Sequence, residues 1–191
     1  MQAQKTTAGY DVGQEIGVLI CSLAREGERS AVVVGAARLD VALERFLKRV
    51  MHHHPGGSDN LFDPDRPLGT FSAKIALAYR LGLLDRDLEH AIQLVRKIRN
   101  EFAHSVTSAS LSESSHSSRV RELRNYAKGA TDLYERMRST LEPVVRNEPL
   151  LSFCVSLSVF ITCVEAASLQ SKPLFGGHPA TLTPPQGAEH S

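Results

Sequence analysis

The residues best suited to chemistry lie in the string LVRKIRNEFAHS, at positions 94–105. Arg96, Asn100 and His104 follow one another at intervals of four, so a helix places them on one face, called the polar stripe below. Arginine offers paired donors to a phosphate or a carboxylate, and histidine exchanges a proton near neutral pH. The pattern therefore predicts a helix that carries a polar, ligand-binding surface.

Arg99 stands between the polar stripe and the apolar face of the same helix, and two interpretations of it stay open. In the structural one, Arg99 pairs with Asp40 or Glu44, two carboxylates four residues apart on an earlier predicted helix. His104 then only stabilises the last helical turn, where a cation is favoured. In the chemical one, Arg99 and His104 act together on a phosphate, as a pair of catalytic residues.

Residues 52–69 are rich in proline and glycine and predict a loop, because such residues cannot lie inside one helix. Asp63 precedes a proline and favours a turn, and Gly69 leads into a helix that Thr70 caps. We expect three apolar side chains to fix this loop to the core, namely Leu61, Phe62 and Leu68. The loop then orients two helices. In the alternative, Asp63 and Arg66 extend the polar stripe into a larger ligand or partner surface.

Apolar residues that recur every three to four positions predict the elements that hold these groups. Six helices are expected, at about 11–26, 30–51, 70–82, 85–104, 119–141 and 150–169. No segment has a strand pattern of any strength. The predicted fold class is an all-α, single-domain bundle of about six helices.

The bundle is expected to span residues 10–170, with a serine-rich linker at 105–118 that has too few apolar residues to pack. Residues 1–9 are expected to form a flexible N-terminus and residues 171–191 a disordered tail. Neither end contributes periodic apolar residues, so we expect neither to stabilise the core.

Charge and cysteine content argue against several classes of function. Lys and Arg number 22 against 21 Asp and Glu, and no helix-turn-helix spacing occurs, so direct duplex DNA binding is not expected. One predicted helix begins with a basic patch, which could contact RNA or an acidic partner. The patch consists of Arg119, Arg121, Arg124 and Lys128. The three cysteines have no CxxC spacing and the N-terminus has no export signal, which predicts reduced thiols in the cytoplasm.

Two other segments have simpler interpretations than their composition first indicates. Residues 150–169 are long enough to span a bilayer, yet Glu165 and several hydroxyl side chains indicate a buried core helix and no membrane contact. His52, His53 and His54 are adjacent, and adjacent residues seldom converge on one ion, so no metal site is expected. No P-loop, dinucleotide-binding or Ser-His-Asp pattern stands out, and no cofactor is expected.

The strings LFDPDRPLGTFSAKI and RKIRNEFAH stand in the order and at the interval found in the mannitol operon repressor family. That family pairs an LFDP…PLGSFSARI segment with an RKIRNDFAH helix, and the chain resembles it over roughly residues 35–105. The resemblance implies negative regulation of transcription. Because the sequence has no element for reading bases, we expect the chain to act as a homodimer through a protein partner, a regulator or an enzyme.

The spacing of Arg99 and His104, with Asn100 after the arginine, also resembles the R-x4–6-H motif of HEPN domains. These are helical bundles, many of them metal-independent ribonucleases, in which the Arg and His of two protomers meet at a dimer interface. The resemblance implies that His104 assists attack by the RNA 2′-hydroxyl while Arg99 stabilises charge on the phosphate. Such a ribonuclease is the alternative to a partner-binding regulator.

Overall fold

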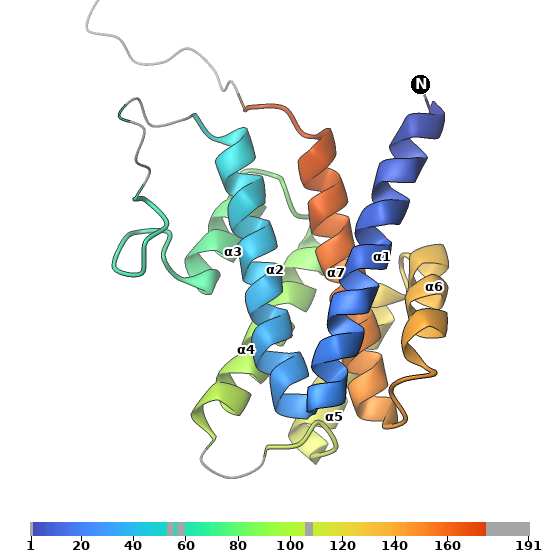
Figure 1. Ribbon diagram of the computed structural model, residues 1–191. Coiled ribbons are helices and arrows are strands. Elements are labelled where there is room, and N and C mark those ends of the chain that lie inside the picture. Colours follow the sequence, from blue (N-terminus) through green and yellow to red (C-terminus); the bar gives the residue numbers. More distant parts are fainter. Residues whose placement is uncertain (1, 53–55, 57–59, 106–108, 175–191) are drawn as a thin grey trace, which may run out of the picture.

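The computed structural model describes residues 2–52, 56, 60–105 and 109–174, with side chains from residue 12 onward. Within these residues the chain forms seven α-helices and no strand (Figure 1). The helices are α1 (Gln2–Glu26), α2 (Glu28–Val50), α3 (Phe71–Arg80), α4 (Arg86–His104), α5 (Ser114–Ala127), α6 (Thr131–Leu141) and α7 (Glu148–Gln170). The predicted all-α bundle is therefore confirmed.

The central helix of the bundle is α7, which contacts α1, α2, α4, α5 and α6. In Figure 1 it runs between α1 and α2, with α3 and α4 on the side of α2 and α6 on the side of α1. All residues from Leu150 to Thr162 are buried, because this sequence is apolar on every side. Three buried hydroxyls, those of Ser156, Ser158 and Thr162, donate to carbonyls four residues earlier at 2.7 to 2.8 Å. Each of these three buried hydroxyl groups therefore has a hydrogen-bond partner within the core.

By length and composition alone, α7 could also cross a membrane. However, 78% of its most apolar 18-residue window is buried inside the bundle. The core helix of a soluble protein passes the same test of length and composition. The burial of α7 agrees with the core helix that the sequence predicts.

Side-chain caps fix the helix starts near the polar stripe. Thr70 Oγ1 accepts a 3.2 Å hydrogen bond from the amide of Ala73, and Asp85 Oδ1 accepts one of 2.8 Å from the amide of Leu88. After α3 the chain turns at Gly82, whose φ of 70° is a left-handed conformation that glycine adopts readily. The cap at Thr70 was predicted from the sequence, and the two caps and the turn together fix the bounds of α3 and α4.

The single helix predicted at 119–141 is wrong, because the structure has two helices there. The first, α5, ends at Ala127, and α6 begins at Thr131 after a short turn. Gly129 lies in that turn, where its amide donates a 3.0 Å hydrogen bond to the carbonyl of Tyr126. A glycine inside a helix costs about 1 kcal/mol relative to alanine, which favours a break at this position.

The described part of the serine-rich segment, Ser105 and residues 109–118, packs against the bundle more closely than its composition indicates. Its helix, α5, begins at Ser114, and Leu111 ahead of it is fully buried. His116 is also buried, with its Nε2 2.7 Å from Glu101 Oε2 and its Nδ1 2.9 Å from the carbonyl oxygen of Ser110. Buried Leu111 and the contact of His116 with Glu101 of α4 therefore hold residues 109–118, part of the expected linker, against the bundle.

Both ends of the chain include residues that the structure describes. Helix α1 begins at Gln2, so helical backbone includes most of the segment expected to be flexible. After α7, the amide of Leu174 donates a 2.8 Å hydrogen bond to the carbonyl of Val50, at the end of α2. The remainder of the expected tail, residues 175–191, lies outside the described residues.

Candidate functional site

Arg96 and Asn100 of the polar stripe line a cavity of about 310 Å³ between α2, α3 and α4, called the α4 pocket below. Its basic and amide groups come from α4, small side chains and a carboxylate come from α2, and the first residues of α3 close it. The walls include Ala37, Asp40, Ser72, Arg96, Arg99 and Asn100. The pocket thus joins three segments that lie far apart in the sequence.

Helix α4 can present these groups because its opposite face is buried. That face is the predicted apolar stripe, which includes Val95, Ile98 and Phe102. On the polar face, Arg96 Nε donates a 2.9 Å hydrogen bond to Gln93 Oε1, and Arg99 Nη1 donates one of 3.1 Å to Asn100 Oδ1. Both acceptors are neutral amides, so the two guanidinium charges remain available to an anion.

Asp40 and Glu44 do form a structural ion pair, but with Lys74 of α3 rather than with Arg99. Lys74 Nζ lies 2.9 Å from Asp40 Oδ1 and 2.8 Å from Glu44 Oε2, and its side chain is only 5% exposed. Among the described residues, Arg99 has no carboxylate within salt-bridge distance and instead contacts Asn100. A buried lysine therefore takes the place that the structural interpretation gave to Arg99.

The pKa values of Glu44 and Lys74 reflect this contact. Burial alone raises the pKa of Glu44, but hydrogen bonds from Lys48 and Lys74 outweigh it and hold the pKa below its ordinary value. Burial alone lowers the pKa of Lys74, but the hydrogen bond to Glu44 and the negative charges of Asp40 and Glu44 outweigh it and raise the pKa. Both groups are charged at neutral pH, so Asp40 faces a fixed positive charge.

A tight loop holds the start of α3 against the pocket. Two successive turns form it, with the amide of Arg66 donating to the carbonyl of Asp63 and the amide of Gly69 to the carbonyl of Arg66, both at 2.9 Å. Gly69 packs so closely on the backbone oxygens of Asp63 and Pro64 that a side chain there would clash. The expected anchors, Leu61, Phe62 and Leu68, pack against the core. The side chains of Asp63 and Arg66 are exposed, outside the lining of the pocket.

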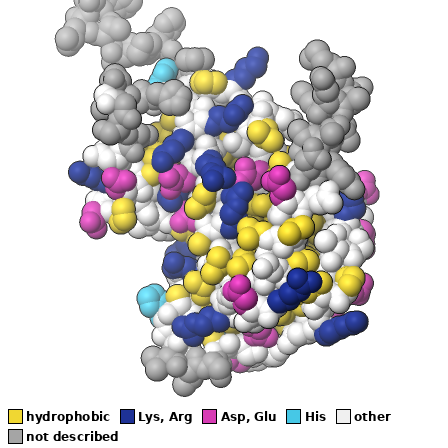
Figure 2. Space-filling view, in the orientation of Figure 1, with side chains coloured by type: hydrophobic (Ala, Val, Ile, Leu, Met, Phe, Trp, Pro, Cys, Tyr) yellow, Lys and Arg dark blue, Asp and Glu magenta, His cyan; other side chains and the backbone are white. Residues whose placement is uncertain are grey.

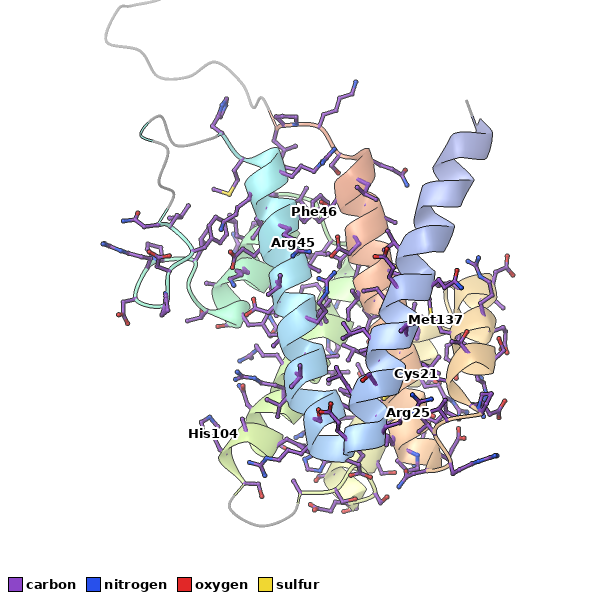
Figure 3. All side chains as sticks on the ribbon, viewed as in Figure 1. Cys21, Arg25, Arg45, Phe46, His104 and Met137 are labelled. Atoms are coloured by element: carbon purple, nitrogen blue, oxygen red, sulfur yellow. The ribbon has the colours of Figure 1, made fainter. Side chains whose placement is uncertain are left out.

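His104 is the last residue of α4, and it lies outside the α4 pocket. Figure 3 shows its side chain at the edge of the bundle, directed away from the other helices. The helix ends at the next residue, Ser105, whose amide donates a 3.0 Å hydrogen bond to the carbonyl of Glu101. Arg99 lines the pocket and His104 does not, so the two groups of the R-x4-H motif do not share this cavity within one chain.

The described residues hold no cluster of three or more His, Cys, Asp or Glu side chains that could bind a metal ion. His52 is exposed, while His53 and His54 lie outside the described residues. Burial raises the pKa of Cys154 to about 12, with Cys21 and Glu28 adding to the effect. Cys154 is therefore a protonated, apolar part of the core, without the thiolate that a nucleophile needs.

Lys74 and His116 are the buried polar residues that sequence reasoning missed. A signal for both was present in the helical period. Lys74 lies on the same helix face as Phe71 and Ala78, and His116 on the same face as Val120. A titratable side chain on the buried face of an amphipathic helix needs a partner, and each of these two has one.

The fold defines the class of protein as an all-α bundle packed around one buried helix. Among solved structures, the chain is similar to a chain in the X-ray structure of the MtlR–HPr complex from Escherichia coli. The TM-score is 0.57 at 17% sequence identity, and the similarity covers 79% of this chain and 99% of that chain. At this identity the likeness shows an MtlR-like fold. No protein-family model matches the chain, and no curated protein sequence matches it.

Proposed function

We propose that the protein is a cytoplasmic, homodimeric regulator of the MtlR type, which represses transcription by binding an HPr-type protein rather than DNA. The observation that carries the proposal is the MtlR-like fold, shared over 99% of a chain from a complex with HPr. The two sequence strings typical of mannitol operon repressors support it, because they form the α3 loop and the polar face of α4.

A surface suited to a protein partner lies on the outer face of α2. Val34, Ala37 and Val41 are spaced three and four residues apart, and the two valines are 47% and 41% exposed. Arg45, one turn further on, has a side chain that is 63% exposed. Figure 2 shows hydrophobic side chains gathered on the face formed by α1, α2 and α7, with basic side chains around them. Exposed apolar residues beside arginine are typical of the centre of a protein interface.

The basic helix start that left RNA contact open is partly engaged within the bundle. Arg119 Nη1 lies 2.7 Å from Glu101 Oε2, and Arg124 lies 3.9 Å from Glu148. Duplex binding through phosphates needs several free cations on one surface, and the net charge of the chain is only +1. These charges favour a protein partner over a nucleic acid.

Titration calorimetry with the HPr protein of the same organism tests the proposal. We expect a saturable complex with a Kd of about 1 μM or tighter. Val34→Asp with Val41→Asp buries two carboxylates in the interface and should weaken binding by about tenfold or more. Leu81→Asp is the matched control, because Leu81 is also exposed but lies in the turn after α3.

Two results would contradict the proposal. One is the absence of any heat of binding with correctly folded protein and HPr at concentrations of about 100 μM, which excludes an affinity useful in a cell. The other is cleavage of RNA by the purified chain, which would favour the ribonuclease alternative.

A further inference from the structure

The α4 pocket is cationic, although it contains a carboxylate. Arg96 and Arg99 contact neutral amide oxygens, and within the described part of the chain neither has a carboxylate at salt-bridge distance. The carboxylate in the wall, Asp40, is matched by Lys74 at 2.9 Å. Two guanidinium groups are therefore left without a counter-charge in one cavity, which is an arrangement that favours an anionic ligand.

The first turn of α3 adds hydrogen-bond donors to the same cavity. Thr70 Oγ1 accepts a hydrogen bond from the amide of Ala73. Among the described residues, no acceptor contacts the amides of Phe71 and Ser72. Phe71 and Ser72 both line the pocket. Free amides at a helix start carry partial positive charge and bind oxygen anions. They supplement the two arginines, which supply the full charges.

These donors are held in place before any ligand arrives. The arginines project from a helix whose opposite face is fully buried, and the start of α3 is fixed by the close packing of Gly69 on Asp63 and Pro64. A rigid arrangement of donors lowers the entropy lost on binding. The cavity of about 310 Å³ also lies near the lower end of the range of about 300–1,000 Å³ that is usual for small-molecule sites.

We propose that the α4 pocket binds the phosphoryl group of a small phosphate monoester. Two planar guanidinium groups and two backbone amides offer more donors than the two oxygens of a carboxylate can accept, whereas a phosphoryl group has three terminal oxygens. The cavity leaves room for an organic part beside that group. His104 lies outside it, so the site binds its ligand without a general acid or base from that residue. The proposal does not depend on the protein partner.

The test is made on the chain alone, with glycerol 3-phosphate as the probe and inorganic phosphate as its competitor. At constant ionic strength we expect saturable heats of binding that inorganic phosphate displaces and that succinate, a carboxylate probe, does not. Arg96→Gln with Arg99→Gln should weaken binding by about tenfold or more. Arg121→Gln is the control, because it removes an exposed arginine of α5 that lies outside the pocket.

A second pair of variants keeps the test valid if the double arginine variant fails to fold. Ala37 is exposed on α2 and lines the pocket. Ala37→Glu places a carboxylate against the arginines and should abolish binding, whereas Ala37→Gln, which adds similar bulk without charge, should bind more tightly than Ala37→Glu. The proposal is overturned if no probe binds, if succinate binds as well as glycerol 3-phosphate, or if Ala37→Glu binds as the native chain does.

Discussion

Lys74 Nζ of α3 lies 2.9 Å from Asp40 Oδ1 of α2, and this contact sets the charge of the α4 pocket. The same ammonium group lies 2.8 Å from Glu44, so one buried cation serves two carboxylates. Because Asp40 pairs with Lys74, Arg99 on α4 is left without a counter-charge among the described residues. The pair also joins α3 to α2, which positions the first turn of α3 at the pocket.

Replacing Lys74 by methionine should destabilise the fold, because Asp40 loses its cation and Glu44 keeps only Lys48. We expect a loss of about 1–3 kcal/mol in the free energy of unfolding, which is less than for a fully buried pair because both carboxylates keep some contact with water. Their side chains are 27% and 25% exposed. Urea unfolding measures the effect, and Lys97→Met, at an exposed position of α4, is the control. Equal unfolding midpoints for the two variants would show that the contact contributes nothing.

Stability should depend on pH through the same group of residues. The pKa of Glu44 is lowered in the folded state, so its contribution is present above the ordinary carboxyl pKa and is lost as the pH falls through the folded value. The pKa of Lys74 is raised, so its contribution is present below the ordinary lysine pKa and is lost as the pH rises through the folded value. The stability difference between the native chain and Glu44→Gln should therefore shrink on acidification. A difference that stays constant from neutral to acidic pH would contradict this.

His116 should matter for stability even though it begins a serine-rich helix. Its ring is buried, lies 5.2 Å from the ring of Phe102 between centroids, and contacts Glu101 and Ser110 through its two nitrogens. His116→Ala removes the buried ring and its contact with the carbonyl of Ser110, while Glu101 keeps Arg119, at an expected cost of about 2–4 kcal/mol. Thermal and urea unfolding measure the loss, and the exposed Ser118→Ala serves as control. A loss as small as that of the control would mean that the segment does not depend on His116.

The difference between what could and could not be predicted is clear from these residues. The caps at Thr70 and Asp85 were predictable because a cap depends on residues within one turn of the chain. The burial of α7 was predictable because its own sequence leaves no polar face. Such features depend on local sequence alone.

The pocket could be predicted only in part. The sequence placed Arg96 and Asn100 on one face, but not the approach of Ala37 and Ser72, which come from other helices. The partner of Asp40 depends on how α3 packs against α2, so the sequence-based prediction considered only Arg99 and missed Lys74. Competition between partners for a charge is a tertiary property.

The ribonuclease alternative predicts a result that the regulator does not. The regulator should leave a mixed RNA pool intact in the presence of EDTA, because His104 is exposed outside the cavity that Arg99 lines. The alternative requires products that end in a 2′,3′-cyclic phosphate and that disappear with His104→Ala at unchanged helical content. Gel analysis of the RNA, with circular dichroism of both proteins, separates the two outcomes.

The central claim is that the chain works by binding an HPr-type protein through the outer face of α2. Methyl NMR of the chain, with valine methyls labelled, tests it most directly when unlabelled HPr is added to saturation. We predict that the signals of the exposed Val34 and Val41 shift, while that of Val155, buried in α7, stays unchanged. A spectrum that does not change at any valine on addition of HPr would contradict the claim.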